Sequence, residues 1–193
     1  MYEEKNIGMY GMSDKYTPIQ RDGDERPAAL RALLLYPMNA LVEDQIARLR
    51  EALDSDDVRL FMKNEMNDNR IYFGSYNGST IGSKSYDLVK AQSTEELTKQ
   101  CKSVAKGLGK MHSAFNDLVE YVNDHPDKKD ALYISPRLGG DNITAEMVTR
   151  WDMQYWAPDI MITNTSMLSI MLMRKAEEKI FQQTKEWLAA KDL

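Results

Sequence analysis

The sequence predicts an α/β fold in which a parallel sheet is flanked by helices. Residues 32–36 form an uninterrupted apolar run, which is typical of a strand buried on both faces of a parallel sheet, and Pro37 ends it. A second short apolar run, residues 159–163, is followed by the polar turn 164–166. A helical pattern follows each run, so the unit of strand, polar turn and helix occurs twice.

The predicted helices rest on apolar residues spaced three and four apart. Residues 40–53 carry one such face, and Asn39 is a good amino-terminal cap for that helix. Residues 94–124 carry the longest pattern, in which two glycines weaken the middle and leave a split there open. A further helix is expected from residue 167 towards residue 187.

Shorter segments complete the expected sheet and its connections. Residues 70–74 are β-branched and aromatic and predict a strand, and residues 131–135 predict another. Thr144 is expected to cap a helix that continues through about Met153. Residues 58–62 fit either a short helix end or an extended piece, and the sequence leaves both open.

The length and composition indicate one globular domain. The 193 residues are enough for a real core, and 42% are hydrophobic and 28% charged. We expect residues 1–29 to form an irregular leader and residues 30–193 to form the domain. The net charge of −5 gives no overall basic field, so any nucleic-acid contact must come from local groups.

The number of cysteines and the length of the apolar segments indicate in which cellular compartment the protein is expected. The single cysteine, Cys101, allows no internal disulfide and fits a reducing environment. No secretory apolar region and no run of about 18 apolar residues occur, so a cytoplasmic protein is the expectation.

Several kinds of chemistry are disfavoured by spacing. The stretch Gly107–Lys110 contains a Gly-Lys pair, but the Walker A pattern requires Gly where Val104 stands and Ser or Thr where Met111 stands. The two histidines lack neighbouring ligands at metal-binding spacing, so no metal site is expected. No nucleophile–base pair or carboxylate dyad is visible, which makes an unrelated α/β enzyme a poor third interpretation.

Two stretches of the sequence contain more specific motifs. Residues 35–50 contain Leu-Tyr-Pro-Met-Asn-Ala-Leu followed by Asp-Gln and Arg-Leu-Arg, and they resemble motif Ia of superfamily 2 helicases. Residues 157–168, Ala-Pro-Asp-Ile-Met-Ile-Thr-Asn-Thr-Ser-Met-Leu, resemble motif Ic of the same superfamily. Residues 146–154 look like a segment of large bacterial DEAD/DEAH-type helicases, some of them linked to phage-defence systems such as DISARM.

This resemblance implies the central part of a first RecA-like lobe. Residues 81–130 match no segment of the family and are expected to be a helical insertion. In helicases of this kind, motifs Ia and Ic hold the phosphate backbone of the bound strand, and a glycine-containing motif Ib loop contributes to the same grip. A plain Asn-Gly turn accounts equally well for the Ib-like loop here. The candidate nucleic-acid-binding residues are Pro37, Met38, Asn39, Ala40, Gly78, Thr80, Thr163, Asn164 and Ser166.

The departures from the family pattern matter as much as the matches. ATP and Mg²⁺ are the cofactors of the family, but the sequence holds no G-x-x-x-x-G-K-[ST] and no DExH box, so the chain alone is not expected to bind or hydrolyse ATP. The expected partners are single-stranded or duplex nucleic acid, more readily DNA, and the remaining helicase lobes or a second chain. Arg137 and Arg150 could add charge to the interface or form surface ion pairs.

Two functional interpretations therefore follow from the sequence. The first is the nucleic-acid-binding portion of an ATP-dependent DNA helicase or translocase. The second is a degenerate RecA-like domain that binds a protein partner and has no ATPase activity. Salt-sensitive binding to single strands, independent of their sequence, discriminates between the two.

Overall fold

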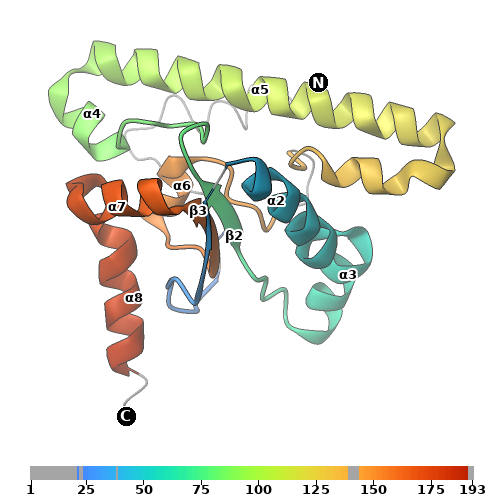
Figure 1. Ribbon diagram of the computed structural model, residues 1–193, viewed down its shortest axis with the longest axis horizontal. Coiled ribbons are helices and arrows are strands. Elements are labelled where there is room, and N and C mark those ends of the chain that lie inside the picture. The colour runs from blue at the N-terminus through green and yellow to red at the C-terminus, as the bar shows by residue number, and fades with distance from the viewer. Residues whose placement is uncertain (1–20, 22–23, 38, 139–143, 191–193) are drawn as a thin grey trace.

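A computed structural model describes residues 21, 24–37, 39–138 and 144–190. Its centre is a three-stranded sheet formed by β1 (Ala32–Tyr36), β2 (Phe73–Tyr76) and β3 (Ile160–Asn164) (Figure 1). The strand order is β1-β3-β2 and both pairings are parallel. The structure is therefore of the mixed α/β kind that the sequence predicts, and it is consistent with a partial RecA-like fold.

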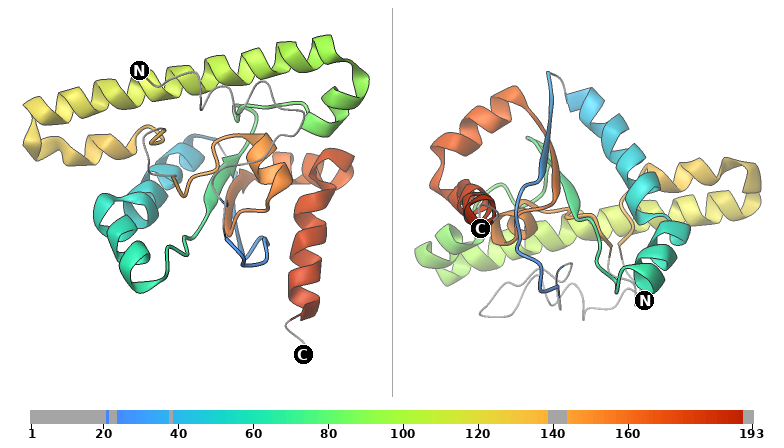
Figure 2. Two further views of the ribbon diagram at one scale, coloured as in Figure 1. Left: turned by 180° about the vertical axis from the view of Figure 1, so that it is seen from behind. Right: turned by 90° about the horizontal axis from the view of Figure 1, so that it is seen from below.

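Each face of the sheet is covered by its own helices (Figure 2). One face packs on α2 (Asn39–Asp54), where Val42 and Ile46 contact Phe73 and Ile162. α3 (Asp56–Glu65) follows α2 directly and settles the open choice over residues 58–62 as helix. The other face packs on α6 (Arg150–Tyr155), α7 (Thr165–Met173) and α8 (Glu178–Ala190).

The outer side of β2 is covered by an extended segment, residues 144–149. The Phe73 N–H donates to the Ala145 carbonyl, and the Met147 N–H donates to the Phe73 carbonyl. Beyond this segment lies α5 (Thr94–Asp124), whose Cys101, Val104 and Leu108 pack with Val148 and Trp151. This edge of the sheet is therefore paired and then covered by a helix, as natural proteins protect sheet edges.

The long helix predicted over residues 94–124 is confirmed and is continuous through both of its glycines. Ser93 caps it by accepting a hydrogen bond from the Glu96 N–H. α4 (Tyr86–Gln92) precedes it, and the 3-10 helix η1 (Pro126–Tyr133) follows it (Figure 1).

The sequence predicted a strand buried on both faces at residues 32–36, and the burial was wrong. In β1, Leu33 is 37% exposed and Leu35 is 44% exposed. Leu34 and Tyr36 point to the opposite face and pack with the α2 cluster, so the described helices cover that face of β1 and leave the face of Leu33 and Leu35 partly open. An apolar run therefore predicts a strand buried on both faces only where helices cover both faces of the sheet at that strand.

One predicted element was of the wrong kind, and a second begins later than expected. Residues 131–135 are not a strand, because 131–133 complete η1, where Pro126 fits the first turn of a helix. The helix expected from Thr144 begins only at Arg150, and Thr149 is its cap through a reciprocal capping box with Asp152. Parallel bridges from Glu146 to Phe73 of β2 and from Thr149 to Ile81 hold this segment beside β2 instead.

Two boundaries also differ. The strand predicted over residues 70–74 forms at Phe73–Tyr76. The helix expected over residues 167–187 is interrupted at Arg174, where the backbone becomes extended before the 3-10 helix η2 (Lys175–Glu177) and α8. Across the described ranges, no helix has the length and apolar character needed to cross a membrane.

Candidate nucleic-acid interface

Three chain segments of the predicted interface leave the sheet at one edge. The register pairs Tyr36 with Asn164 and Tyr76 with Thr163, so the carboxyl ends of β1, β3 and β2 lie side by side. Pro37 follows β1 and the turn 77–80 follows β2 at this edge. Open parallel sheets bind ligands outside the carboxyl ends of their strands. The predicted meeting of the first and last junctions at one edge is confirmed.

The start of α7 presents the clearest anion-binding geometry. The Asn164 side chain accepts a hydrogen bond of 2.7 Å from the Met167 N–H and so caps the helix. Thr165 and Ser166, the first residues of α7, are exposed. The positive end of the helix dipole and early backbone N–H groups without intrahelical acceptors favour an anion here.

Thr163 occupies a different environment from the other two predicted residues of this junction. Its side chain is fully buried, and its hydroxyl donates to the Tyr76 carbonyl. It therefore joins β3 to β2 at their carboxyl ends, and it stabilises the sheet there from a buried position. Ser166 is the exposed side chain among the three residues predicted here.

The first junction is described only in part. Pro37 is exposed at the end of β1, Met38 lies outside the described residues, and α2 begins at Asn39. Asn39 and Ala40 therefore supply the first backbone groups of α2 at the same edge. Two helices, α2 and α7, begin next to each other in this way, since their preceding strands are paired.

The turn after β2 is fixed by side-chain hydrogen bonds. Asn77 Oδ1 accepts from the Ser79 N–H at 2.9 Å and from the Thr80 N–H at 3.2 Å. The Thr80 hydroxyl donates to the Ser75 carbonyl at 2.8 Å. Gly78 stands at the exposed tip with open space around it. The predicted contact at Gly78 is thus accessible, whereas the Thr80 side chain holds the turn in shape.

A buried polar network lies beneath this turn. Arg150 Nη2 donates to the Asn77 carbonyl at 2.6 Å, and its guanidinium lies 5.2 Å from the centre of the Tyr76 ring. The Tyr76 hydroxyl donates to Glu177 Oε1 at 2.6 Å and accepts from Gln154 Nε2 at 2.9 Å. Burial raises the pKa of Tyr76 above its ordinary value, and the hydrogen bond to Glu177 raises it further.

The network links the turn to α6 and to the η2–α8 junction, and sequence reasoning missed it. Its partners are separated by 23 to 101 positions, so no local pattern marks them. Of the two predicted arginines, Arg150 is buried in this network, whereas Arg137 forms a surface ion pair with Asp56 at 2.5 Å. Asn77 Nδ2, Arg150 Nε and Gln154 Oε1 have no hydrogen-bond partner in the described part of the chain. Such orphaned groups are typical positions for ordered water.

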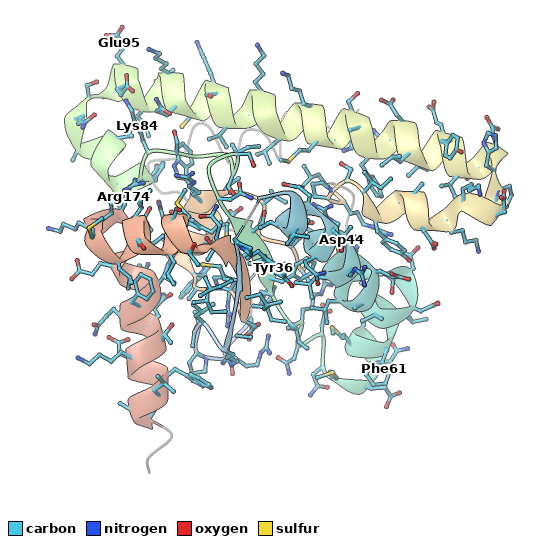
Figure 3. All side chains as sticks on the ribbon, in the orientation of Figure 1. Tyr36, Asp44, Phe61, Lys84, Glu95 and Arg174 are labelled. Atoms are coloured by element: carbon cyan, nitrogen blue, oxygen red, sulfur yellow. The ribbon has the colours of Figure 1, made fainter. Side chains whose placement is uncertain are left out.

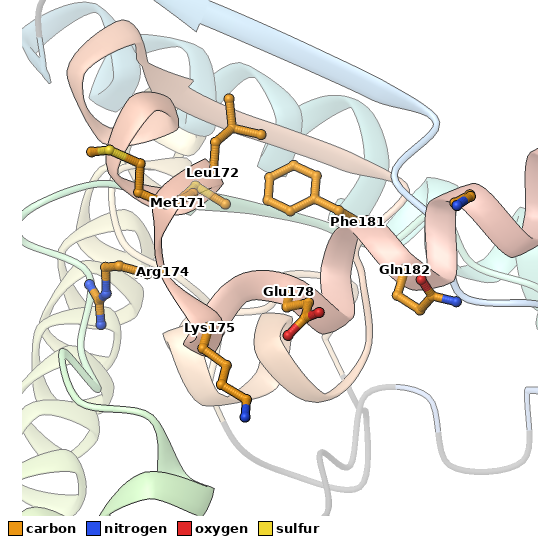
Figure 4. A pocket seen from close by; sticks show the side chains of 9 residues that line it. Met171, Leu172, Arg174, Lys175, Glu178, Phe181 and Gln182 are labelled. Carbon is orange, nitrogen blue, oxygen red and sulfur yellow. The ribbon is translucent and has the colours of Figure 1, made fainter.

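A separate hollow of about 580 Å³ lies in the elbow between α7 and α8 (Figure 4). Leu172 and Phe181 approach each other on one side of it, and Lys175 and Glu178 lie on the other. Its lining carries both signs of charge and no glycine-rich phosphate loop. Among the residues that the structure describes, no cluster of His, Cys, Asp and Glu suits a metal ion.

Comparisons with known proteins give one significant relative among curated sequences. The chain is 32% identical over 202 residues to Druantia protein DruE of Escherichia coli (strain UMEA 4076-1). The match covers 89% of this chain and 11% of that protein, so the chain spans about a ninth of its relative's length. No protein-family model matches the chain, and no solved structure matches it significantly. Over most of its length, the chain is therefore similar to one short part of a much longer protein.

Proposed function

We propose that the chain is the nucleic-acid-binding portion of an ATP-dependent DNA helicase or translocase that acts in phage defence in the cytoplasm. The observation that carries this proposal is the meeting of the Ia-like and Ic-like segments at one sheet edge. The similarity to Druantia protein DruE and the resemblance to defence-linked helicases support the cellular role.

The grip on DNA is exerted by backbone groups and small polar side chains. The first N–H groups of α2 and α7 lie at the carboxyl ends of β1 and β3, and the Ser166 hydroxyl adds a donor beside them. The exposed Gly78 lets a phosphate approach the backbone of the turn 77–80 closely. Contacts of this kind hold phosphate and sugar and carry no sequence information. A motor that moves along any sequence requires that indifference.

In the proposed motor, ATP and Mg²⁺ are bound by other residues than those of the sheet edge described above. The sequence contains no Walker A loop, and the sheet edge offers N–H donors without the lysine that such a loop places on the phosphates. This chain therefore contributes strand binding, and nucleotide hydrolysis requires further catalytic groups.

A charge placed at the start of α7 tests the proposal. Ser166→Glu puts a carboxylate where we propose a phosphate, so affinity for a single-stranded oligonucleotide should fall by about tenfold or more, measured by fluorescence anisotropy. The same carboxylate suits the helix dipole, so the fold should not lose stability. Ala189→Glu, on the exposed carboxyl end of α8, is the matched control and should bind as the unmodified chain does. Equal affinities for both variants would refute the proposed interface.

The second candidate, a protein-interaction domain, is favoured by one observation. Leu172 and Met173 at the end of α7 are 65% and 80% exposed, beside the hollow that Phe181 lines. Exposed apolar side chains gathered at one place mark many protein interfaces. Absence of salt-dependent binding to DNA by the unmodified chain would give this candidate the lead.

A further inference from the structure

Four lysines form a stripe along the outer face of α5. Lys99, Lys102, Lys106 and Lys110 are all exposed and follow one another at steps of three and four residues. This spacing places them on one side of the helix, opposite the buried Cys101. At a rise of 1.5 Å per residue, the stripe is about 16 Å long. Figure 3 shows nitrogen-tipped side chains along the amino half of α5, on the side that points away from the sheet.

The four lysines form no ion pair with the described residues, and Lys99 has a longer-range electrostatic interaction with Glu96. Nearby Glu96 is paired with Lys84, which lies outside the stripe, at 2.7 Å. Four ammonium groups on a chain of net charge −5 are therefore a local exception to its overall charge.

The same helix face changes sign further along. Asp117, Glu120 and Asp124 continue the line of the lysines and are exposed. A polyanion is attracted to the first half of this face and repelled from the second. The charge pattern therefore confines any anionic partner to the amino half of α5.

The surroundings of the stripe favour a nucleic acid over a membrane. A helix that binds a membrane inserts its apolar face, but Val104 and Leu108 of α5 are packed against Val148 and Trp151. On the lysine side of α5 the neighbouring residues are small, such as Ser103 and Gly109, and include no large apolar side chain. One strand of duplex DNA carries a phosphate per about 3.4 Å of the helix axis, so a stripe of about 16 Å runs beside about five phosphates of one strand. A phosphate backbone therefore offers more charge than the four lysines need.

We infer that Lys99, Lys102, Lys106 and Lys110 form a second contact with the phosphate backbone of the DNA. This inference rests on the proposed function, because it extends the same ligand to a surface outside the sheet edge. The contact is purely electrostatic, so it lengthens the footprint on DNA without adding sequence preference.

The salt dependence of binding tests the stripe. The full chain carrying Lys99→Gln, Lys102→Gln, Lys106→Gln and Lys110→Gln keeps good helix formers at exposed positions, so its circular dichroism should be unchanged. Anisotropy titrations with a labelled single strand of about 30 nucleotides, between about 50 and 200 mM salt, should show the slope of log K against log salt reduced by about 3. The matched control changes four exposed lysines elsewhere, Lys63, Lys129, Lys175 and Lys185, to Gln. It produces the same change in net charge and should leave the slope within about 1 of the original.

The two salt slopes decide whether the lysine stripe contacts DNA. A smaller slope for the stripe variant and not for the control supports the stripe. Equal slopes for the two variants overturn it. Binding to polyglutamate-coated beads and to anionic vesicles is measured in parallel. A stripe variant that loses this binding but keeps its binding to DNA also overturns the inference. If Ser166→Glu weakens binding while the stripe variant does not, the sheet edge stands and the stripe fails. The reverse result retains the stripe and rejects the sheet edge.

Discussion

Arg50 and Glu146 form a buried two-pronged ion pair that fastens α2 to the extended segment beside β2. Arg50 Nε lies 2.7 Å from Glu146 Oε2, and Arg50 Nη2 lies 2.9 Å from Glu146 Oε1. Arg50 Nη1 also donates to the carbonyls of Tyr133 and Ile134, at 3.1 and 2.8 Å. One guanidinium therefore joins α2, the end of η1 and the covered side of β2.

Glu146→Ala should destabilise the fold by about 3–5 kcal/mol, because it leaves the Arg50 charge buried without its partner. The control is Asp44→Ala, which removes an exposed partner of Arg48 within α2 and should cost less than about 1 kcal/mol. Urea denaturation of both variants measures the difference. Similar losses for the two variants would show that the buried pair carries no special weight.

The two glycines of α5 should respond in opposite ways to alanine. Nothing lies within 4 Å of a Cβ added at Gly109, so Gly109→Ala should stabilise the helix by about 0.5–1 kcal/mol. A Cβ at Gly107 meets Ile81 Cδ1 at 2.6 Å, so the gain in helix propensity is offset by displacement of that side chain. Thermal melts of the two variants compare these effects directly, and a larger gain at Gly107 would contradict the packing described here.

Stability should fall at alkaline pH because of Tyr72. Burial raises the pKa of Tyr72 from 10.0 to about 12, and the nearby Asp24 carboxylate adds to the rise. Above pH 10 the unfolded chain loses this phenol proton while the folded chain keeps it, so stability declines as pH rises towards 12. The decline reaches up to about 1.4 kcal/mol per pH unit from this group.

Urea titrations from about pH 9 to about pH 12 test this expectation in Tyr72→Phe, which should show a shallower decline than the unmodified chain. Tyr121→Phe, at an exposed tyrosine, is the control and should keep the original slope. A Tyr72→Phe variant with the original slope would assign the alkaline loss to other groups.

The cap of α7 should contribute to stability independently of any ligand. Asn164→Ala removes the acceptor of the Met167 N–H and should cost about 1 kcal/mol, whereas Asn164→Asp keeps an acceptor and should recover most of it. Chemical denaturation without nucleic acid measures both. If Asn164→Ala is neutral, the start of α7 is held by packing rather than by its cap.

Sequence reasoning succeeded where local signals decide the structure. Short-range patterns predicted the apolar strands β1 and β3 and the helices α2 and α5. Pro37 and Asn164 mark the ends of the two strands. It failed at residues 144–149, where a helix cap signal at Thr144 was overridden by pairing with β2. The tertiary contacts that decide this conformation cannot be seen in a window of neighbouring residues.

The candidate site likewise has features that the sequence predicted and features that it did not. The residue types that begin α7 and form the turn 77–80 were visible in the sequence, and their shared edge follows from parallel strands. The inward direction of Thr163 and the support that Arg150 gives to Asn77 were not visible. Both depend on contacts between segments more than 70 positions apart.

The unequal edges of the sheet limit how this chain can self-associate. The N–H and C=O groups of Leu33 and Leu35 point away from β3, because alternate residues of β1 serve that pairing. Two copies could pair through β1 about a twofold axis at Leu34, which would set each Leu33 opposite the other copy's Leu35. The far edge of each copy is already covered by residues 144–149 and α5, so such a pair would leave no free sheet edge among the described residues. Pairing of the described residues through β1 would therefore join two copies and would not continue to a third.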